Sequence, residues 1–457
     1  MPSAKASIYY IGANLISRAL GFALTPVFTR MLSPEEYGIY SVYTSFLGIF
    51  TVITTLEISG SVLYRAISNV GEEERCAIIS STAGAQIILS LIFSIIYIIF
   101  RNFFYAIVPL SLTLSLILIA QVCINSIESI YFINKRYLYD YKRVSYINIA
   151  KGVLSSLLSF ALIKTSLLGE GRIYAPFIIS FIFILPIGIS IFRKGKVFLK
   201  KDTLRYILFS AIPSLPYSLS TSLIASVDRI TVSKIYGEAV VGKYSVAHSL
   251  GLALSLITGG LTLALMPWMT RKLRENDNVK IKRALSLSVR FVSLATHFFL
   301  CVAPEIFALF APTGYRNAIS SVYTVAISVT PAFIAGLYSN LILLVDKPYT
   351  LIKSSLPTAV FAVISSYIFA LKFGPYGASV SHLCSCILLF ILNGVLVSRR
   401  IKSIRIKPLD FAYSFFLLFF FGFLLFFLRE FIISRILIFL AISLLALGEI
   451  YKIKKAV

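Results

Sequence analysis

Long apolar stretches, separated by short polar connectors, run along the whole chain. A helix that crosses the hydrocarbon core of a membrane, which is about 30 Å thick, needs about 20 mostly apolar residues. By that criterion the pattern predicts fourteen spans and therefore an all-α polytopic membrane protein. The predicted spans are 7–28, 37–57, 77–100, 105–127, 145–163, 173–192, 206–227, 240–267, 286–303, 321–344, 352–371, 376–397, 411–428 and 431–451.

The last two predicted spans are separated only by Arg429 and Glu430. Together they cover about 40 residues, roughly twice what one helix needs to cross the membrane. We therefore predict two helices in this region.

Two six-residue segments, 204 positions apart, resemble each other: YGIYSV at 37–42 and VGKYSV at 241–246. Gly, Tyr, Ser and Val align, and a basic residue lies eight positions before each Gly, at Arg30 and Lys234. Each segment opens a long apolar stretch. Such similarity at half-chain distance predicts a duplicated bundle, because many transporters are built from two related halves around a central site.

Six spans per half is an even number, so both copies enter the membrane in the same direction and form a parallel repeat. The predicted organisation is two six-helix bundles followed by two C-terminal helices. Its segments are an N-terminal half at 1–192, a basic cytoplasmic linker at 193–205, a second half at 206–397, and the two additional helices with a basic tail at 398–457.

The distribution of basic residues supports this count of spans. With the N-terminus in the cytoplasm, 31 of the 43 Lys and Arg residues fall in the cytoplasmic connectors and tails. Eleven fall on the other side, and Arg18 lies within a span. Because cytoplasmic connectors of membrane proteins are enriched in Lys and Arg, we expect both termini to be cytoplasmic.

Composition narrows the classes of function. The chain is 58% hydrophobic and 14% charged, against about 25% charged residues in soluble domains. Its net charge of +24 comes from short clusters at helix ends rather than from a polar domain, which disfavours nucleic-acid binding. No GxxxxGK[ST] motif for ATP and no soluble catalytic domain is visible, so we expect neither an enzyme nor a bound cofactor.

Cysteine and histidine do not indicate a metal site. The five cysteines lie in or beside apolar stretches without metal-ligand or disulfide spacing. The three histidines, His248, His297 and His382, fall in three separate stretches, so we interpret them as packed side chains, although a proton-carrying role for one of them stays open.

Ionisable residues in or beside apolar stretches are stronger functional candidates, because a charge inside the membrane is costly unless it faces a partner or a wet cavity. The candidates are Arg18, Glu57, Glu128, Asp228, Arg229 and Arg290. For Glu57, Glu128 and Arg290 we favour positions at the membrane edge. Asp228 and Arg229 could form a structural pair at the end of the seventh span.

Arg18 differs from the others because it lies about eleven residues into the first span. Asn14 and Gly21 fall on or near its helical face, at i−4 and i+3. Asn14 could orient the guanidinium, and Gly21 would allow close approach of a ligand or a neighbouring helix. The alternative is a buried ion pair with Glu57 or Asp228.

Several segments resemble a known family of exporters. They are NLISRALG at 14–21, TPVFTRMLSPEEYGIY at 25–40, DRI at 228–230 and VGKYSVA at 241–247, followed by Pro267. In this order they look like polysaccharide exporters of the multidrug/oligosaccharidyl-lipid/polysaccharide (MOP) superfamily, specifically O-antigen flippases of the Wzx type. The two additional C-terminal spans are similar to those of lipid II flippases.

The resemblance implies two six-helix bundles around a cationic cavity, working by alternating access in the bacterial inner membrane. The cargo would be an undecaprenyl-diphosphate-linked oligosaccharide, and the expected cavity residues are Arg18, Asn14, Asp228, Arg229, Glu57 and Arg290. Coupling to H⁺, Na⁺ or the membrane potential is expected in place of a cofactor. Expected partners are membrane lipid, a polysaccharide polymerase and a chain-length regulator, and no nucleic acid.

Two other functions stay open. A membrane glycan polymerase or ligase would need a sizeable extracytoplasmic loop with convergent catalytic groups, whereas the connectors here are short. A cation-coupled drug exporter of the same superfamily would share the same fold. We favour the flippase over both.

Overall fold

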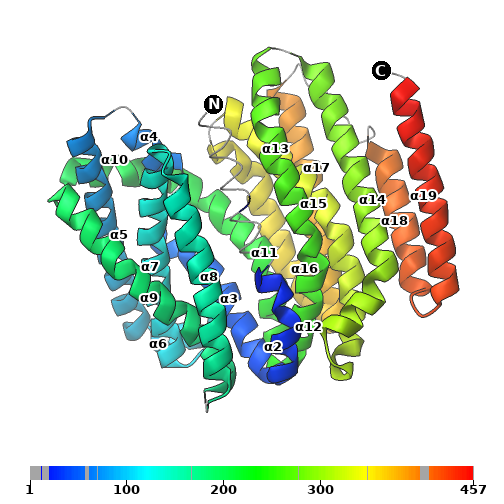
Figure 1. Ribbon diagram of the computed structural model, residues 1–457, viewed down its shortest axis with the longest axis horizontal. Coiled ribbons are helices and arrows are strands. Elements are labelled where there is room, and N and C mark those ends of the chain that lie inside the picture. The colour runs from blue at the N-terminus through cyan, green and yellow to red at the C-terminus, as the bar shows by residue number, and fades with distance from the viewer. Residues whose placement is uncertain are drawn as a thin grey trace. The chain divides into compact units, whose positions relative to one another are not determined.

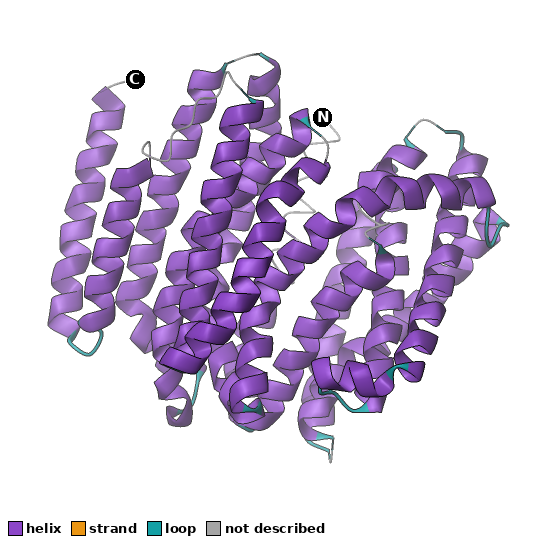
Figure 2. Ribbon diagram, turned by 180° about the vertical axis from the view of Figure 1, so that it is seen from behind, coloured by secondary structure: helices purple, strands orange, loops and turns teal. Residues whose placement is uncertain are grey.

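The computed structural model describes residues 12, 20–56, 61–68, 70–165, 167–275, 277–346, 348–401 and 411–455. Every regular element among these residues is a helix (Figure 2). Among the described residues, eleven helices are long and apolar enough to cross a membrane, and two shorter apolar ones follow near the C-terminus. These thirteen correspond to the second to fourteenth predicted spans. Most of the first predicted span lies outside the described residues.

The contacts divide the chain into two compact units. Unit 1 comprises residues 1–24 and 31–233, and unit 2 comprises residues 25–30 and 234–457. This division rests on contacts within the folded chain. The predicted linker at 193–205 instead rests on the sequence, and it stays a prediction.

Unit 1 is built mainly from long helices that pack on one another. Helices α5, α7 and α9 contact each other, α3 packs on all three, and α8 lies along α9. Buried Leu63, Ile79, Ile130 and Ile191 belong to the apolar core between α4, α5, α7 and α9. Its elements are α3 (Pro34–Thr55), α4 (Ser61–Ile67), α5 (Glu72–Ile99), α6 (Arg101–Ile107), α7 (Leu112–Tyr137), α8 (Tyr141–Ile163), α9 (Leu168–Gly195), α10 (Lys201–Ala211), η1 (Ile212–Ser214) and most of α11 (Leu215–Tyr236).

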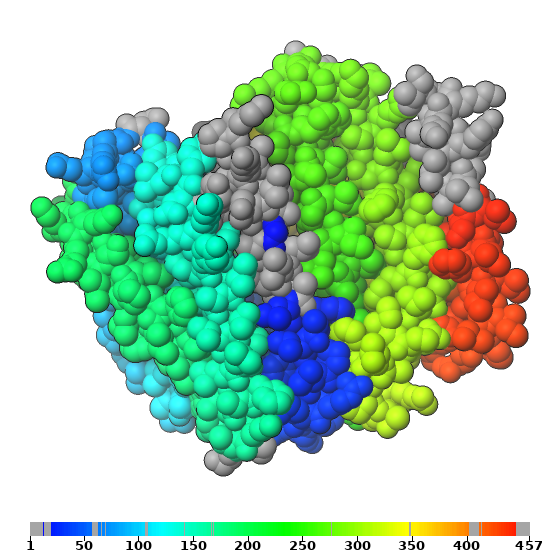
Figure 3. All heavy atoms as spheres, viewed as in Figure 1, coloured from blue at the N-terminus to red at the C-terminus, as the bar shows by residue number. Residues whose placement is uncertain are grey.

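Unit 2 is organised around α15, which contacts α12, α13, α14, α17 and α18. Helices α18 and α19 lie beside α14 (Figure 1). In the space-filling view they form one edge of this unit (Figure 3). Its elements are α2 (Thr25–Met31), α12 (Glu238–Gly251), η2 (Leu252–Leu254), α13 (Ser255–Arg274), α14 (Asn278–Phe310), η3 (Thr313–Ala318), α15 (Ile319–Val345), η4 (Pro348–Leu351), α16 (Ile352–Phe373), α17 (Pro375–Arg400), α18 (Ala412–Phe427) and α19 (Ile432–Lys455).

The positions of the helices agree with a repeat. Helix α3 begins at Pro34 and α12 at Glu238, which is the 204-residue offset of the two sequence segments. The pair α7 and α15 begins at Leu112 and Ile319, a similar offset. Helices α18 and α19 follow the second copy, as the sequence predicts.

One predicted span is displaced in the structure. The sequence predicts a helix over 105–127, but α6 ends at Ile107 and α7 runs from Leu112 to Tyr137. Pro109 explains the break, because the residue before a proline is driven out of the helical region. The Ser111 side chain then caps α7 by accepting a hydrogen bond from the backbone N–H of Leu114 (3.3 Å).

Candidate functional site: charged side chains within the helical units

Three of the six predicted cavity residues, Asn14, Arg18 and Glu57, lie outside the described residues. Their roles therefore stay predictions. Asp228 and Arg229 lie on α11 in unit 1, whereas Arg290 lies half-buried on α14 in unit 2.

Asp228 is almost fully buried, with 1% of its surface exposed. Its Oδ1 accepts a hydrogen bond from the backbone N–H of Arg229 (2.8 Å) and lies 4.0 Å from that residue's Nε. The Arg229 guanidinium also donates to the carbonyl of Ala225, one helical turn earlier (2.8 Å). This geometry favours the structural pair considered from the sequence, and lining of a cavity stays a prediction for both residues.

The sequence did not reveal a buried ion pair between Glu128 on α7 and Lys151 on α8. The two side chains are only 6% and 17% exposed, and Nζ of Lys151 donates to Oε2 of Glu128. Within the described part of the chain, Oε1 of Glu128 is buried without a hydrogen-bond partner. Glu128 therefore lies in the interior of unit 1, and its expected position near the membrane edge stays a prediction.

Polar side chains continue along the same face of α7. Gln121 lies two turns before Glu128, and its Oε1 accepts a hydrogen bond from the hydroxyl of Tyr43 on α3 (2.6 Å). On α5, Gln86 donates to the carbonyl of Thr54 (3.2 Å). Unit 1 therefore has a polar interior between α3, α5, α7 and α8. The seven-residue spacing of Gln121 and Glu128 was the signal in the sequence that could have predicted it.

Two tyrosines of the first repeated segment, residues 37–42, contact an arginine of another helix. The guanidinium carbon of Arg172 on α9 lies 3.9 Å from the ring centroid of Tyr40 and 4.6 Å from that of Tyr37. A Cβ added to Gly169 would lie 2.6 Å from Cβ of Glu36, so only glycine permits this close approach of α9 to α3. Cation–π contacts of a desolvated arginine are worth about 2 kcal/mol.

In unit 2, α12 and α17 bring two of the three histidines together. The rings of His248 and His382 are edge to face with centroids 5.3 Å apart, and Sγ of Cys386 lies 3.7 Å from Nε2 of His382. Their spacing in the sequence gives no sign of this contact, because it depends on how the second and last helices of the second copy pack.

A second buried charge fixes the last helix of unit 2. Arg435 on α19 is 6% exposed, and its guanidinium donates to both oxygens of Glu305 on α14 (2.5 and 2.7 Å) and to the carbonyl of Cys301 (2.6 Å). Such a bidentate pair is directional and strong. It ties α19 to α14, and thereby the C-terminal pair of helices to the second copy of the repeat.

Helices of this length and composition define a multi-pass integral membrane protein. A family model described as polysaccharide biosynthesis protein matches residues 3–273. The chain therefore belongs to the polysaccharide biosynthesis protein family. This confirms the resemblance that the sequence segments carry.

Individual relatives are distant. The Lsg locus protein 1 of Haemophilus influenzae is 24% identical over 285 residues, which cover 60% of this chain and 68% of that protein. Among solved structures, a MATE protein in its straight conformation matches with a TM-score of 0.63 and 17% identity, covering 88% of this chain and 96% of that one. The inward-facing conformation of a multidrug resistance MATE family transporter of the MOP superfamily has the same score and identity, covering 85% and 95%. The chain therefore has the fold of these MATE transporters.

Proposed function

We propose that this protein flips an undecaprenyl-diphosphate-linked oligosaccharide, the repeat unit of an O-antigen or similar polysaccharide, across the bacterial inner membrane. The observation that carries the proposal is membership of the polysaccharide biosynthesis family over residues 3–273 in a chain with a transporter fold. Under this proposal the protein works by alternating access.

The physical chemistry of the cargo fits a protein with charged groups inside its helical units. A diphosphate and its sugars cannot cross hydrocarbon unaided, so a carrier must offer polar partners within the membrane. Unit 1 has such groups in the buried polar face of α7, and Arg18 would add a guanidinium, whose planar fork of donors suits phosphate.

A drug exporter is the second candidate, because one matched fold is that of a multidrug resistance transporter. That likeness rests on 17% identity and concerns the fold alone. Such an exporter would alter drug sensitivity and leave the glycan unaffected, so a genetic test separates the two.

Deletion of the gene tests the proposal. In a strain without a redundant flippase, we expect surface polysaccharide to disappear while the lipid-linked repeat unit accumulates at the cytoplasmic face. Glycan blotting and extraction of lipid-linked sugars measure both quantities. Normal surface polymer would contradict the proposal, and single surface units without polymer would favour a polymerase.

The proposed orientation places both termini in the cytoplasm. Single cysteines introduced at 196, 272 and 400 should be protected from a membrane-impermeant maleimide in intact cells and labelled after lysis. All three positions carry basic residues of the predicted cytoplasmic connectors. Labelling of any one of them in intact cells would refute this topology.

A further inference from the structure

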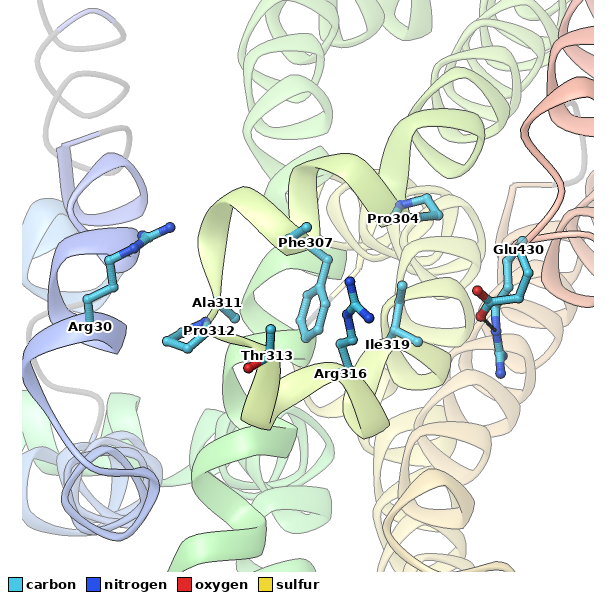
Figure 4. A pocket seen from close by; sticks show the side chains of 11 residues that line it. Arg30, Pro304, Phe307, Ala311, Pro312, Thr313, Arg316, Ile319 and Glu430 are labelled. Carbon is cyan, nitrogen blue, oxygen red and sulfur yellow. Dashed lines mark ion pairs between the residues drawn. The ribbon is translucent and has the colours of Figure 1, made fainter.

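Three arginines from distant segments line one cavity of unit 2. The cavity has a volume of about 430 Å³ and is lined by Arg30 of α2, Arg316 of η3 and Arg429 of the α18–α19 turn (Figure 4). Glu430 is the one acidic residue among those that line it. Three guanidiniums against one carboxylate leave the cavity cationic.

Two of these guanidiniums are held in place by the protein. Arg30 donates to the carbonyls of Pro26 (2.9 Å) and Leu309 (2.8 Å). Arg429 donates to the hydroxyl of Ser320 (3.0 Å), and its guanidinium carbon lies 4.9 Å from the ring centroid of Phe426. Because a guanidinium has five N–H donors, each still has donors left for a ligand.

Arg316 is exposed, as Arg30 is, whereas Arg429 is half-buried. No hydrogen bond or ion pair to another residue of the described chain holds its side chain, and Figure 4 shows it between Phe307 and Ile319. Glu430 does not neutralise it, because that carboxylate is 79% exposed and lies 3.5 Å from Nε of Arg429. Arg316 therefore offers a complete set of donors.

The position of the cavity makes this charge unexpected. It lies at the end of α14 where that helix stops at Phe310, whereas the basic residues in the last turn of α13 and the first turns of α14 lie at the start of the same helix (Figure 1). The 33 residues of α14 separate the two ends by about 50 Å. The count of basic residues predicts the Phe310 end to be extracytoplasmic, the side on which Lys and Arg are depleted.

Exposed apolar side chains lie next to the cavity residues in the chain. Leu309, Phe431 and Ile433 are 65%, 62% and 72% exposed. In a membrane such side chains contact acyl chains, which places the neighbouring guanidiniums at the level of the lipid headgroups.

We infer that this cavity binds the phosphoryl group of a membrane lipid at the extracytoplasmic face. Arginine is suited to phosphate because its fork of donors matches two phosphate oxygens. The phosphoryl group can come from an anionic phospholipid or from a polyprenyl diphosphate. The inference does not depend on the proposed transport activity.

The test uses the purified full-length protein and native mass spectrometry with added lipid. The probes are undecaprenyl diphosphate, phosphatidylglycerol, inorganic phosphate and an uncharged galactolipid. Arg316→Gln is the informative variant because it breaks no hydrogen bond or ion pair within the described chain. Arg271→Gln is the matched control, an arginine of unit 2 whose side chain is 72% exposed in the last turn of α13.

We expect Arg316→Gln to weaken binding of a phosphoryl lipid by about tenfold, as expected for loss of a charge-assisted hydrogen bond, while Arg271→Gln binds as the wild type does. A loss for both lipids would identify a general headgroup site, and a loss for undecaprenyl diphosphate alone a site for that lipid. Unchanged affinity in Arg316→Gln, equal binding of the galactolipid, or binding of inorganic phosphate without either lipid would overturn the inference.

Discussion

Glu128→Gln should destabilise the protein by about 3 kcal/mol, because it leaves the Lys151 ammonium in the interior of unit 1 without its carboxylate. Breaking a buried ion pair by removing one partner costs about 3–5 kcal/mol, and the partial exposure of Lys151 places the effect at the lower end. Unfolding of the purified protein in detergent, followed by circular dichroism, measures the loss of stability.

The double variant Glu128→Gln/Lys151→Met tests whether the unpaired Lys151 charge causes this loss of stability. Replacing both charges removes the unpaired ion, so most of the lost stability should return. Glu275→Gln is the control, because Glu275 pairs with Arg271 and Lys272 at the exposed end of α13, where such pairs contribute little to stability. Equal effects of Glu128→Gln and Glu275→Gln would show that the buried pair does not matter for stability.

Arg18→Ala should abolish flipping while the protein remains at normal abundance in the membrane. Arg18 lies outside the described residues, and the prediction rests on its position within an apolar span, where an arginine costs about 2.5–3.5 kcal/mol to insert. A residue that lines the cavity and contacts the diphosphate would justify that cost. Surface polysaccharide and immunoblotting of membranes measure the two quantities.

Two further observations separate this role from a structural one. Arg18→Lys should also flip poorly, because lysine keeps the charge but lacks the bidentate fork. If Arg18 instead forms a buried ion pair, Arg18→Ala should lower the abundance of the protein. Full activity of Arg18→Ala at normal abundance would exclude an essential role.

The helices could be predicted from the sequence because each depends on a local property. An apolar stretch of about 20 residues is enough to indicate a span, and the motif at residues 37–42 together with its copy at 241–246 indicated the repeat. The start of α7 was displaced because apolar composition alone does not mark where Pro109 interrupts a helix.

The contacts of the charged residues could not be predicted in the same way. Glu128 and Lys151 lie on different helices, and which faces meet depends on helix rotation, for which a helix that is apolar all round gives little signal. The cationic cavity is harder still, since Arg30, Arg316 and Arg429 come from three segments that meet only in the folded unit. Asp228 and Arg229, adjacent in the chain, were the pair that local spacing could suggest.

Reconstitution tests the proposed function most directly. Purified protein is placed in liposomes with a fluorescent undecaprenyl-diphosphate-linked oligosaccharide, and an impermeant quencher reports how fast the inner-leaflet label becomes accessible. The account predicts faster translocation than in protein-free liposomes, and no acceleration with the Arg18→Ala variant. Translocation no faster than in protein-free liposomes, together with uptake of a cationic drug by the same preparation, would contradict it.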